Sequence, residues 1–162
     1  MNNFTHLDES GQMRMVEVGD KRETLRRATA GCRIVVGPKV FPQLLAGRLP
    51  KGDVWAAARL AGIMAAKNTA QLIPLCHPLP LTGIDIDFTP EPEDWAVAIR
   101  ARVRTFARTG VEMEALTAAA VAALTVYDMC KAVDRGMVIT NLLLMEKSGG
   151  ASGAYTREAA TP

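Results

Sequence analysis

The sequence predicts an α+β fold in which an antiparallel sheet carries two long helices on one of its faces. Several segments alternate between apolar and polar residues, as strands with one buried face do. Two other segments are long, rich in alanine and free of proline, as helices are. Because the strands alternate in the antiparallel manner and the helices need a surface to bury against, we expect a two-layer sandwich.

The predicted strands differ in how clearly they alternate. They lie at residues 13–18, 34–36, 84–88, 95–106 and 137–145. In the longest of them apolar residues fall on one face, whereas Arg100, Arg102 and Arg104 fall on the other, as a period of two requires. One face of the sheet is therefore expected to be apolar, and the other to meet solvent or a ligand.

Two proline-free segments predict the helices. The first runs from Asp53 to Leu72 and stops before Pro74. The second runs from Val111 to Val133, carries glutamates in its first turn, where the helix dipole favours them, and ends before Gly136. Alanine lines both segments, and helices lined by alanine approach their neighbours closely. We therefore expect the two helices to pack together on the sheet.

Size and composition favour one cytoplasmic domain. The chain has 162 residues and a formal net charge of +2, with no long basic block that would bind nucleic acid. No apolar run reaches the roughly 20 residues that a membrane span needs, and the N-terminal segment lacks the pattern of a secretory signal. We expect one domain over residues 1–153 and a mobile tail over 154–162.

The stretch QLIPLCHPLP, residues 71–80, is unusually rigid and contains one of two histidines in the chain. Its prolines fix φ and remove backbone donors, so it continues neither a helix nor a central strand. The rigidity either presents His77 to a ligand or makes a stiff turn. Cys76 and His77 alone do not make a zinc site, and Cys32 and Cys130 are far away in sequence. We expect reduced thiols and no metal.

Three polar clusters are candidates for binding an anion or moving a proton. The KGD motif that begins at Lys51 precedes a helix, where N–H groups attract anions, although an Asp N-cap beside a solvated lysine is simpler. Asp128 and Lys131 lie one turn apart on an otherwise apolar helix. We expect them to be partly buried and suited to proton transfer, with an ordinary ion pair as the alternative. The segment EKSGGASG, residues 146–153, forms either a phosphate loop or a flexible linker.

Glu114 lies 14 residues before Asp128 on the same predicted helix. At a rise of 1.5 Å per residue the two are about 21 Å apart, too far for one small molecule to touch both. If all the polar clusters serve one ligand, the site must be built from two subunits. A simpler interpretation is that Glu114 only complements the helix dipole.

Long stretches of the chain resemble one known family. They are THLDESGQMRMVEVGDK at residues 5–21, KGDV at 51–54, ARLAGIMAAKNTAQLIPLCHPLPL at 58–81, TGVEMEALTAAAVAALTVYDMCKAV at 109–133 and KSGG at 147–150. Together they resemble the cyclic pyranopterin monophosphate synthase family of molybdenum cofactor (molybdopterin) biosynthesis. Blocks of this length are far more specific than a short motif.

The resemblance implies a single catalytic domain over residues 1–153 that acts as a lyase. The family converts (8S)-3′,8-cyclo-7,8-dihydroguanosine 5′-triphosphate to cyclic pyranopterin monophosphate and releases pyrophosphate. The resemblance also implies a ferredoxin-like antiparallel sheet with two long helices on one face, and a homohexamer, a trimer of dimers, with its sites between subunits. It implies no resident cofactor, and the sequence does not indicate whether Mg²⁺ accompanies the triphosphate.

Positions that match the family's motifs imply the site residues. The implied catalytic residues are Asp128, Lys51 and Lys131. The implied substrate-binding residues are Leu75, Cys76, His77, Met113, Glu114, Lys147 and Arg26. On this interpretation the prolines hold His77 at a rigid subunit edge, where the base of the substrate binds.

The chemistry of these residues suits the reaction and leaves two other interpretations open. Lysines beside a partly buried aspartate suit the proton transfers that open a cyclised purine, and cations near a glycine loop suit a triphosphate. A non-catalytic oligomeric module that binds an anionic nucleotide would use the same lysines and glycines. A metal hydrolase would instead use Cys76, His77 and Asp128 as ligands.

Overall fold

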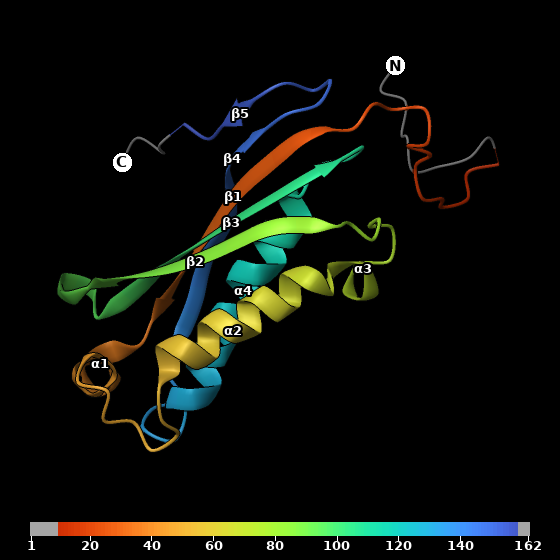
Figure 1. Ribbon diagram of the computed structural model, residues 1–162. Helices are drawn as coiled ribbons and strands as arrows, with labels where there is room; N and C mark the ends of the chain where they lie inside the picture. The colour runs from red at the N-terminus through yellow and green to blue at the C-terminus, as the bar shows by residue number, and fades with distance from the viewer. Residues whose placement is uncertain (1–9, 159–162) are drawn as a thin grey trace.

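The structure is a computed structural model that describes residues 10–158 (Figure 1). Its strands are β1 (Thr24–Val35), β2 (Leu81–Glu91), β3 (Ala96–Ala107), β4 (Val138–Ser148) and β5 (Tyr155–Thr156). Its helices are α1 (Gly37–Leu45), α2 (Val54–Lys67), α3 (Thr69–Leu72) and α4 (Glu112–Cys130), with a short 3₁₀ turn, η1 (Pro92–Asp94). This mixture of elements is the α+β composition that the sequence predicts.

The strands form one antiparallel sheet in the order β2-β3-β1-β4-β5. Helices α2 and α4 lie side by side across one face of this sheet (Figure 1). Helix α4 packs on β1, β3 and β4, whereas α2 packs on α4 and β2. The predicted antiparallel sheet with two long helices on one face is confirmed.

Alternation along β3 produces the core. Val97, Ile99, Ala101 and Val103 are buried on the helix-covered face. Alanines of α4 meet them: Ala115, Ala118, Ala119, Ala122 and Ala123 are all fully buried. Because alanine carries no bulk beyond Cβ, the helix lies close to the sheet and the two layers exclude water over most of its length.

Helix α2 approaches α4 at Gly62. A Cβ atom at this position would lie 2.9 Å from the carbonyl oxygen of Ala118 and would overlap the side chain of Ile86. Only glycine fits without a shift of backbone, although it weakens an isolated helix. The residue that the sequence marks as a weak helix breaker therefore allows α2 to approach both α4 and β2 closely.

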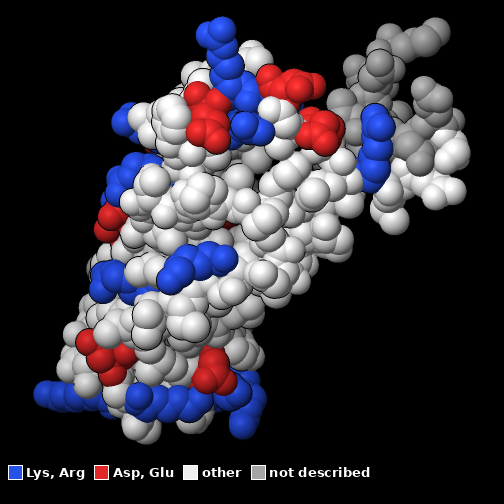
Figure 2. Space-filling model, turned by 45° about the vertical axis from the view of Figure 1, so that its right-hand side comes forward, with Lys and Arg blue, Asp and Glu red and all other residues white. Residues whose placement is uncertain are grey.

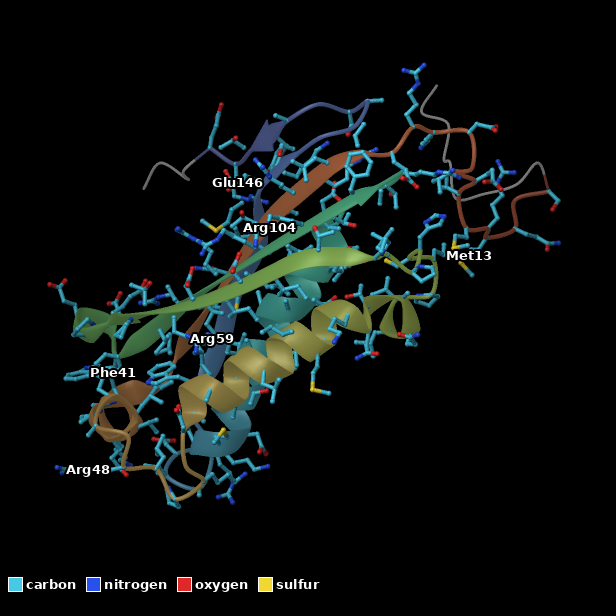
Figure 3. The ribbon with its side chains drawn as sticks, in the orientation of Figure 1. Met13, Phe41, Arg48, Arg59, Arg104 and Glu146 are labelled. Atoms are coloured by element: carbon cyan, nitrogen blue, oxygen red, sulfur yellow. The ribbon has the colours of Figure 1, made fainter. Side chains whose placement is uncertain are left out.

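The other face of the sheet is charged. Arg102 and Arg104 of β3 pair with Asp87 and Asp85 of β2, and the Arg104 Nη2–Asp85 Oδ2 distance is 2.9 Å. Figure 3 shows Arg104 and Glu146 on the side of the sheet that lies away from α2 and α4. The expected separation into an apolar face and a polar face is confirmed.

The sequence patterns did not predict most of strand β1 or helix α1. Strand β1 begins at Thr24, ten residues before the predicted segment 34–36, because its buried positions hold small residues such as Ala28 and Ala30. Helix α1 contains Pro42, which argues against a helix interior, yet the helix buries Phe41 and Leu44. Tertiary burial outweighs local preference in both segments.

The sequence patterns predicted one strand that does not form, one continuous helix that is interrupted, and one helix end that lies too far along the chain. Residues 13–18 form no strand, since only Met13 makes an isolated bridge. The predicted helix from Asp53 to Leu72 is interrupted at Asn68, whose φ of −109° and ψ of 12° separate α2 from α3. The later helix ends at Cys130, before the predicted Val133. Short apolar runs and helix ends carry weak periodic signals.

Helix α4 is long and apolar enough to cross a membrane by length and composition, but half of its apolar window is buried inside the protein. It packs on the sheet as a core helix. Within residues 154–162, Tyr155–Thr156 form β5 and pair with Glu146 and Lys147. The mobility of this tail stays a prediction.

Candidate active site

A cluster of three charged side chains lies at the C-terminal end of α4. Lys51, in the turn before α2, donates from Nζ to Asp128 Oδ2 at 2.8 Å and to the Asp128 carbonyl at 2.9 Å. Lys131 donates to the other carboxylate oxygen, Oδ1, at 2.6 Å. Asp53 caps α2 by accepting from the Ala56 N–H and so fixes the turn that carries Lys51. Sequence spacing predicts the pair Asp128–Lys131, and the fold adds Lys51.

This Lys51–Asp128–Lys131 cluster is open to solvent, and Figure 2 shows basic and acidic side chains together on the surface at the lower end of the molecule, where α2 begins and α4 ends (Figure 1). The Asp128 side chain is 55% exposed, so the expectation of a partly buried pair is wrong. Hydrogen bonds from Lys131 and then Lys51 lower the pKa of the Asp128 carboxyl to about 2. Asp128 is therefore an ionised carboxylate at neutral pH that holds two lysine side chains in place.

A cavity of about 320 Å³ lies at the opposite end of α4. Its walls include five of the seven residues that the resemblance implies for substrate binding, namely Leu75, Cys76, His77, Met113 and Glu114, together with Lys21 and Glu112. Two chain segments far apart in sequence meet here because α4 begins beside the loop that follows α3. The structure thus brings the predicted substrate-binding pairs together in one cavity.

Glu114 is the buried acid of this cavity. Only 4% of the residue is exposed, and burial, followed by the charge of Glu112, raises the pKa of its carboxyl to about 7. Burial, followed by the charge of Glu114, also raises the pKa of the Cys76 thiol. Glu114 can therefore hold or release a proton near neutral pH, whereas the Cys76 thiol stays protonated.

His77 is held from both sides. The Cys76 N–H donates to the Ile73 carbonyl at 3.1 Å, and Thr105 Oγ1 donates to the Pro80 carbonyl at 2.7 Å, so the proline-rich loop is tied at both ends. His77 Nε2 lies 2.9 Å from the carbonyl oxygen of Val16. Residues 16–21 of the N-terminal segment therefore contribute to the wall of this cavity.

Lys147 and Arg26 lie near the end of β4 and the start of β1. Lys147 Nζ donates to Ser152 Oγ within the glycine-rich loop. The Arg26 guanidinium donates to backbone carbonyls of Ala107, Arg108 and Gly149. Lys147 also lines a cleft of about 480 Å³ that Arg27, Arg102 and Arg104 make basic.

Comparison of the sequence with models of protein families identifies the family of this chain. The model of the MoaC family matches residues 15–150, which include every candidate site residue. The chain belongs to the MoaC family. The predicted resemblance is confirmed.

Relatives in this family match almost the whole chain. A cyclic pyranopterin monophosphate synthase from Pelotomaculum thermopropionicum is 60% identical over 158 residues, which are 98% of this chain and 93% of the relative. One from Thermomicrobium roseum is also 60% identical and covers 98% of this chain and 95% of its own. One from Nostoc sp. is 54% identical over 153 residues, 94% of this chain and 91% of the relative.

Within one MoaC chain the site residues remain in separate places. Helix α4 runs unbroken from Glu112 to Cys130, so the Glu114 cavity and the Lys51–Asp128–Lys131 cluster stand about 21 Å apart along its axis. Sequence reasoning missed Lys21, Arg27 and the lining role of Glu112. Lys21 is the last residue of the N-terminal stretch that resembles the family, but no periodicity or spacing indicates that it lines a site.

The residues do not assemble into a metal centre. Within residues 10–158 no three His, Cys, Asp or Glu side chains lie close enough to hold an ion. Cys76 and His77 are at one end of α4, and Asp128 is at the other. The ligand set that a metal hydrolase would need is therefore not formed within one chain.

Proposed function

We propose that this chain is a lyase, a cyclic pyranopterin monophosphate synthase. It converts (8S)-3′,8-cyclo-7,8-dihydroguanosine 5′-triphosphate to cyclic pyranopterin monophosphate and releases pyrophosphate. The observation that carries the proposal is the 60% identity, over 98% of the chain, to relatives that bear this name. The substrate is a small nucleotide, which agrees with a chain whose net charge is only +2.

The Lys51–Asp128–Lys131 cluster is proposed to move protons on the ring system. Opening a cyclised purine requires protons to pass on and off ring nitrogens, and lysine ammonium groups are suitable donors. Asp128 holds both ammonium groups within hydrogen-bond distance of one carboxylate. The carboxylate therefore orients the two lysines, which exchange protons with the ring.

The Glu114 cavity is proposed to bind the base. A guanine-derived ring presents N–H donors, which a carboxylate accepts, and the flat ring suits walls made by Leu75 and Met113. His77 adds a ring nitrogen from the rigid proline loop. Since the Val16 carbonyl lies against His77, this part of the N-terminal segment also contacts the bound base.

Lys147 is proposed to hold the triphosphate. Formation of the cyclic phosphate joins a substrate hydroxyl oxygen to the α-phosphorus, releases the hydroxyl proton to water, and breaks the bond from that phosphorus to the oxygen bridging to the β-phosphate. The leaving pyrophosphate takes the electron pair of the broken bond, so cations near it stabilise the transition state. The ammonium of Lys147 and the basic cleft beside it supply such charge.

The complete site is proposed to form between subunits of a homohexamer, a trimer of dimers. The separation of about 21 Å along α4 supports it, since one ligand does not span both ends of one chain. Leu60 and Met64 on α2 and Leu124 on α4 are more than half exposed, which favours burial against another copy. We propose a cytoplasmic enzyme with no resident cofactor and no nucleic-acid or membrane partner.

The first test supplies the purified protein with the cyclised dihydroguanosine triphosphate under anaerobic conditions. Pyrophosphate and the pterin product, followed by mass, should appear together. Tight binding of the substrate with neither product would replace the synthase with a non-catalytic nucleotide-binding module. Measurement of the particle mass in the same sample reports the hexamer.

A further inference from the structure

The Arg26 guanidinium is occupied by the protein's own backbone. Nη2 donates to the Arg108 carbonyl at 3.0 Å, and Nε donates to the Ala107 carbonyl at 3.4 Å. Nη1 donates to the Gly149 carbonyl at 3.4 Å. Among the described residues no carboxylate pairs with Arg26. Each of the three guanidinium nitrogens thus has a backbone partner.

These three hydrogen bonds join two segments that carry site residues. The first segment, 107–110, leads directly into α4, whose first turn holds Met113 and Glu114. The second segment follows Lys147 at the end of β4. Arg26 on β1 lies between them, and sequence separations of 81 and 123 residues are closed by one side chain. The relative placement of Lys147 and the Glu114 cavity therefore depends on this clamp.

The glycine-rich loop leaves space for the Arg26 guanidinium because Gly150 has no side chain. Gly149 and Gly150 have φ values of +96° and +79°. A Cβ at Gly150 would overlap Nη1 of Arg26, whereas a Cβ at Gly149 would overlap the carbonyl oxygen of Leu25. Gly153, with φ +68°, has no neighbour within 4 Å of such a Cβ. Gly150 thus serves the arginine contact as well as the turn, whereas Gly153 serves the turn alone.

We propose that Arg26 is a positioning residue that clamps the Lys147 segment against the start of α4 and does not itself contact the substrate. This role replaces the direct substrate-binding role that the sequence suggested. The effect of this clamp on catalysis rests on the proposed synthase function. A planar guanidinium reaches three carbonyls in fixed directions, which the single ammonium of a lysine does not reproduce.

The first test compares Arg26→Lys with Arg26→Gln in the full chain. A clamp requires the planar guanidinium with its N–H groups in fixed directions, which neither lysine nor glutamine provides. Both variants should therefore lower kcat/KM by about tenfold to a hundredfold. Most of the loss should be in kcat, because misplaced groups slow the reaction of the bound substrate. A phosphate contact requires only charge. Near wild-type activity in Arg26→Lys, with a raised KM in Arg26→Gln, would overturn the proposal.

The second test leaves every charge in place. Gly150→Ala pushes the guanidinium away, whereas Gly153→Ala adds the same methyl group at a similar φ without touching Arg26. Gly150→Ala should reproduce the loss seen in Arg26→Lys, and Gly153→Ala should retain most activity. Equal activities for the two glycine variants would contradict the clamp.

A third readout does not depend on catalysis. Amide hydrogen exchange over residues 148–153 of the free protein should be faster in Arg26→Lys and Gly150→Ala than in the wild type and Gly153→Ala. Unchanged exchange in both clamp variants would overturn the proposal. An inactive wild type with the expected exchange pattern would instead refute the synthase function and leave the clamp standing.

Discussion

The two ends of α4 place their acids in opposite surroundings. At the C-terminal end, Asp128 lies in solvent between two lysines, and the pKa of its carboxyl falls to about 2. At the N-terminal end, Glu114 is buried in the wall of a cavity and forms no ion pair among the described residues, and the pKa of its carboxyl rises to about 7. The same helix therefore carries one acid that is fixed as an anion and one that titrates near neutral pH.

The difference shows what burial and pairing each contribute. Ion pairs in water are individually weak in stability, but two of them fix the orientation of Lys51 and Lys131 around one carboxylate. Burial without an ion pair penalises the charged form and makes a proton available to a ligand. One end of α4 is suited to orienting cations, and the other to exchanging hydrogen bonds with a base.

The largest expected effect is at the exposed end. Asp128→Asn should lower the rate of pyrophosphate release by about 10²–10⁴-fold, because the neutral amide does not hold both ammonium groups in the orientation needed for proton transfer. Fold and particle mass should stay unchanged, since Asp128 is exposed.

Asp94→Asn is the matched control for Asp128→Asn. Asp94 is also an exposed aspartate, 2.5 Å from a nitrogen of Arg33, but it lies in η1. The Asp94→Asn variant should retain most of the rate of pyrophosphate release. An Asp128→Asn enzyme that is as active as this control would remove Asp128 from the mechanism.

Mixing two inactive variants tests whether the two ends meet across subunits. Asp128→Asn and Glu114→Gln, unfolded and refolded together in equal amounts, should regain about one quarter of wild-type activity. Half of the randomly formed dimers are mixed, and one of the two sites in each mixed dimer is intact.

The control mixture combines Asp128→Asn with Lys131→Gln, two changes at the same end. Each mixed site then carries one of them, so no activity should return. Equal recovery in both mixtures, or none in either, would show that the two ends do not form a shared site.

Glu114→Gln should change how stability depends on pH. Above pH 4.5 an unfolded Glu114 loses its proton, whereas the folded one keeps its proton up to about pH 7. The folded state then binds more protons, so wild-type stability falls as the pH rises over this interval. The uncharged glutamine avoids this loss, and the variant should be more stable than the wild type at pH 8 by up to about 3 kcal/mol.

Urea unfolding at pH 4.5 and pH 8 measures this difference. Glu93→Gln, which alters an exposed glutamate in η1, serves as the control and should show little change at either pH. A Glu114→Gln protein with the same pH dependence as the wild type would show that Glu114 is not desolvated in solution.

The smallest expected effect concerns the two lysines. Lys131 contributes the larger share of the lowered pKa of Asp128 and Lys51 the smaller. Lys131→Gln should therefore move that pKa further towards its usual 3.8 than Lys51→Gln does. Carboxyl carbon titration by NMR measures both shifts, and the reverse order would assign Lys51 as the main partner.

Local patterns predicted much of the fold. The charge alternation of β3, the helix α4 and the pair Asp128–Lys131 all follow from spacing within one segment. The same approach missed α1 and most of β1, because Pro42 and buried alanines give no clear period. Short periodic signals also produced the false strand at 13–18. Periodicity reports the burial of large side chains and is weak where burial involves small ones.

The sequence by itself determined the family, the two-layer architecture and the residue types of the site. It did so because long matching blocks and clear periods are properties of the chain alone. Only the tertiary structure decided that Lys51 meets Asp128 across 77 positions, that Glu114 is buried and Asp128 exposed, and that Arg26 binds backbone carbonyls. These outcomes depend on which surfaces the packed helices and strands bring together or exclude from water, and no local spacing encodes that.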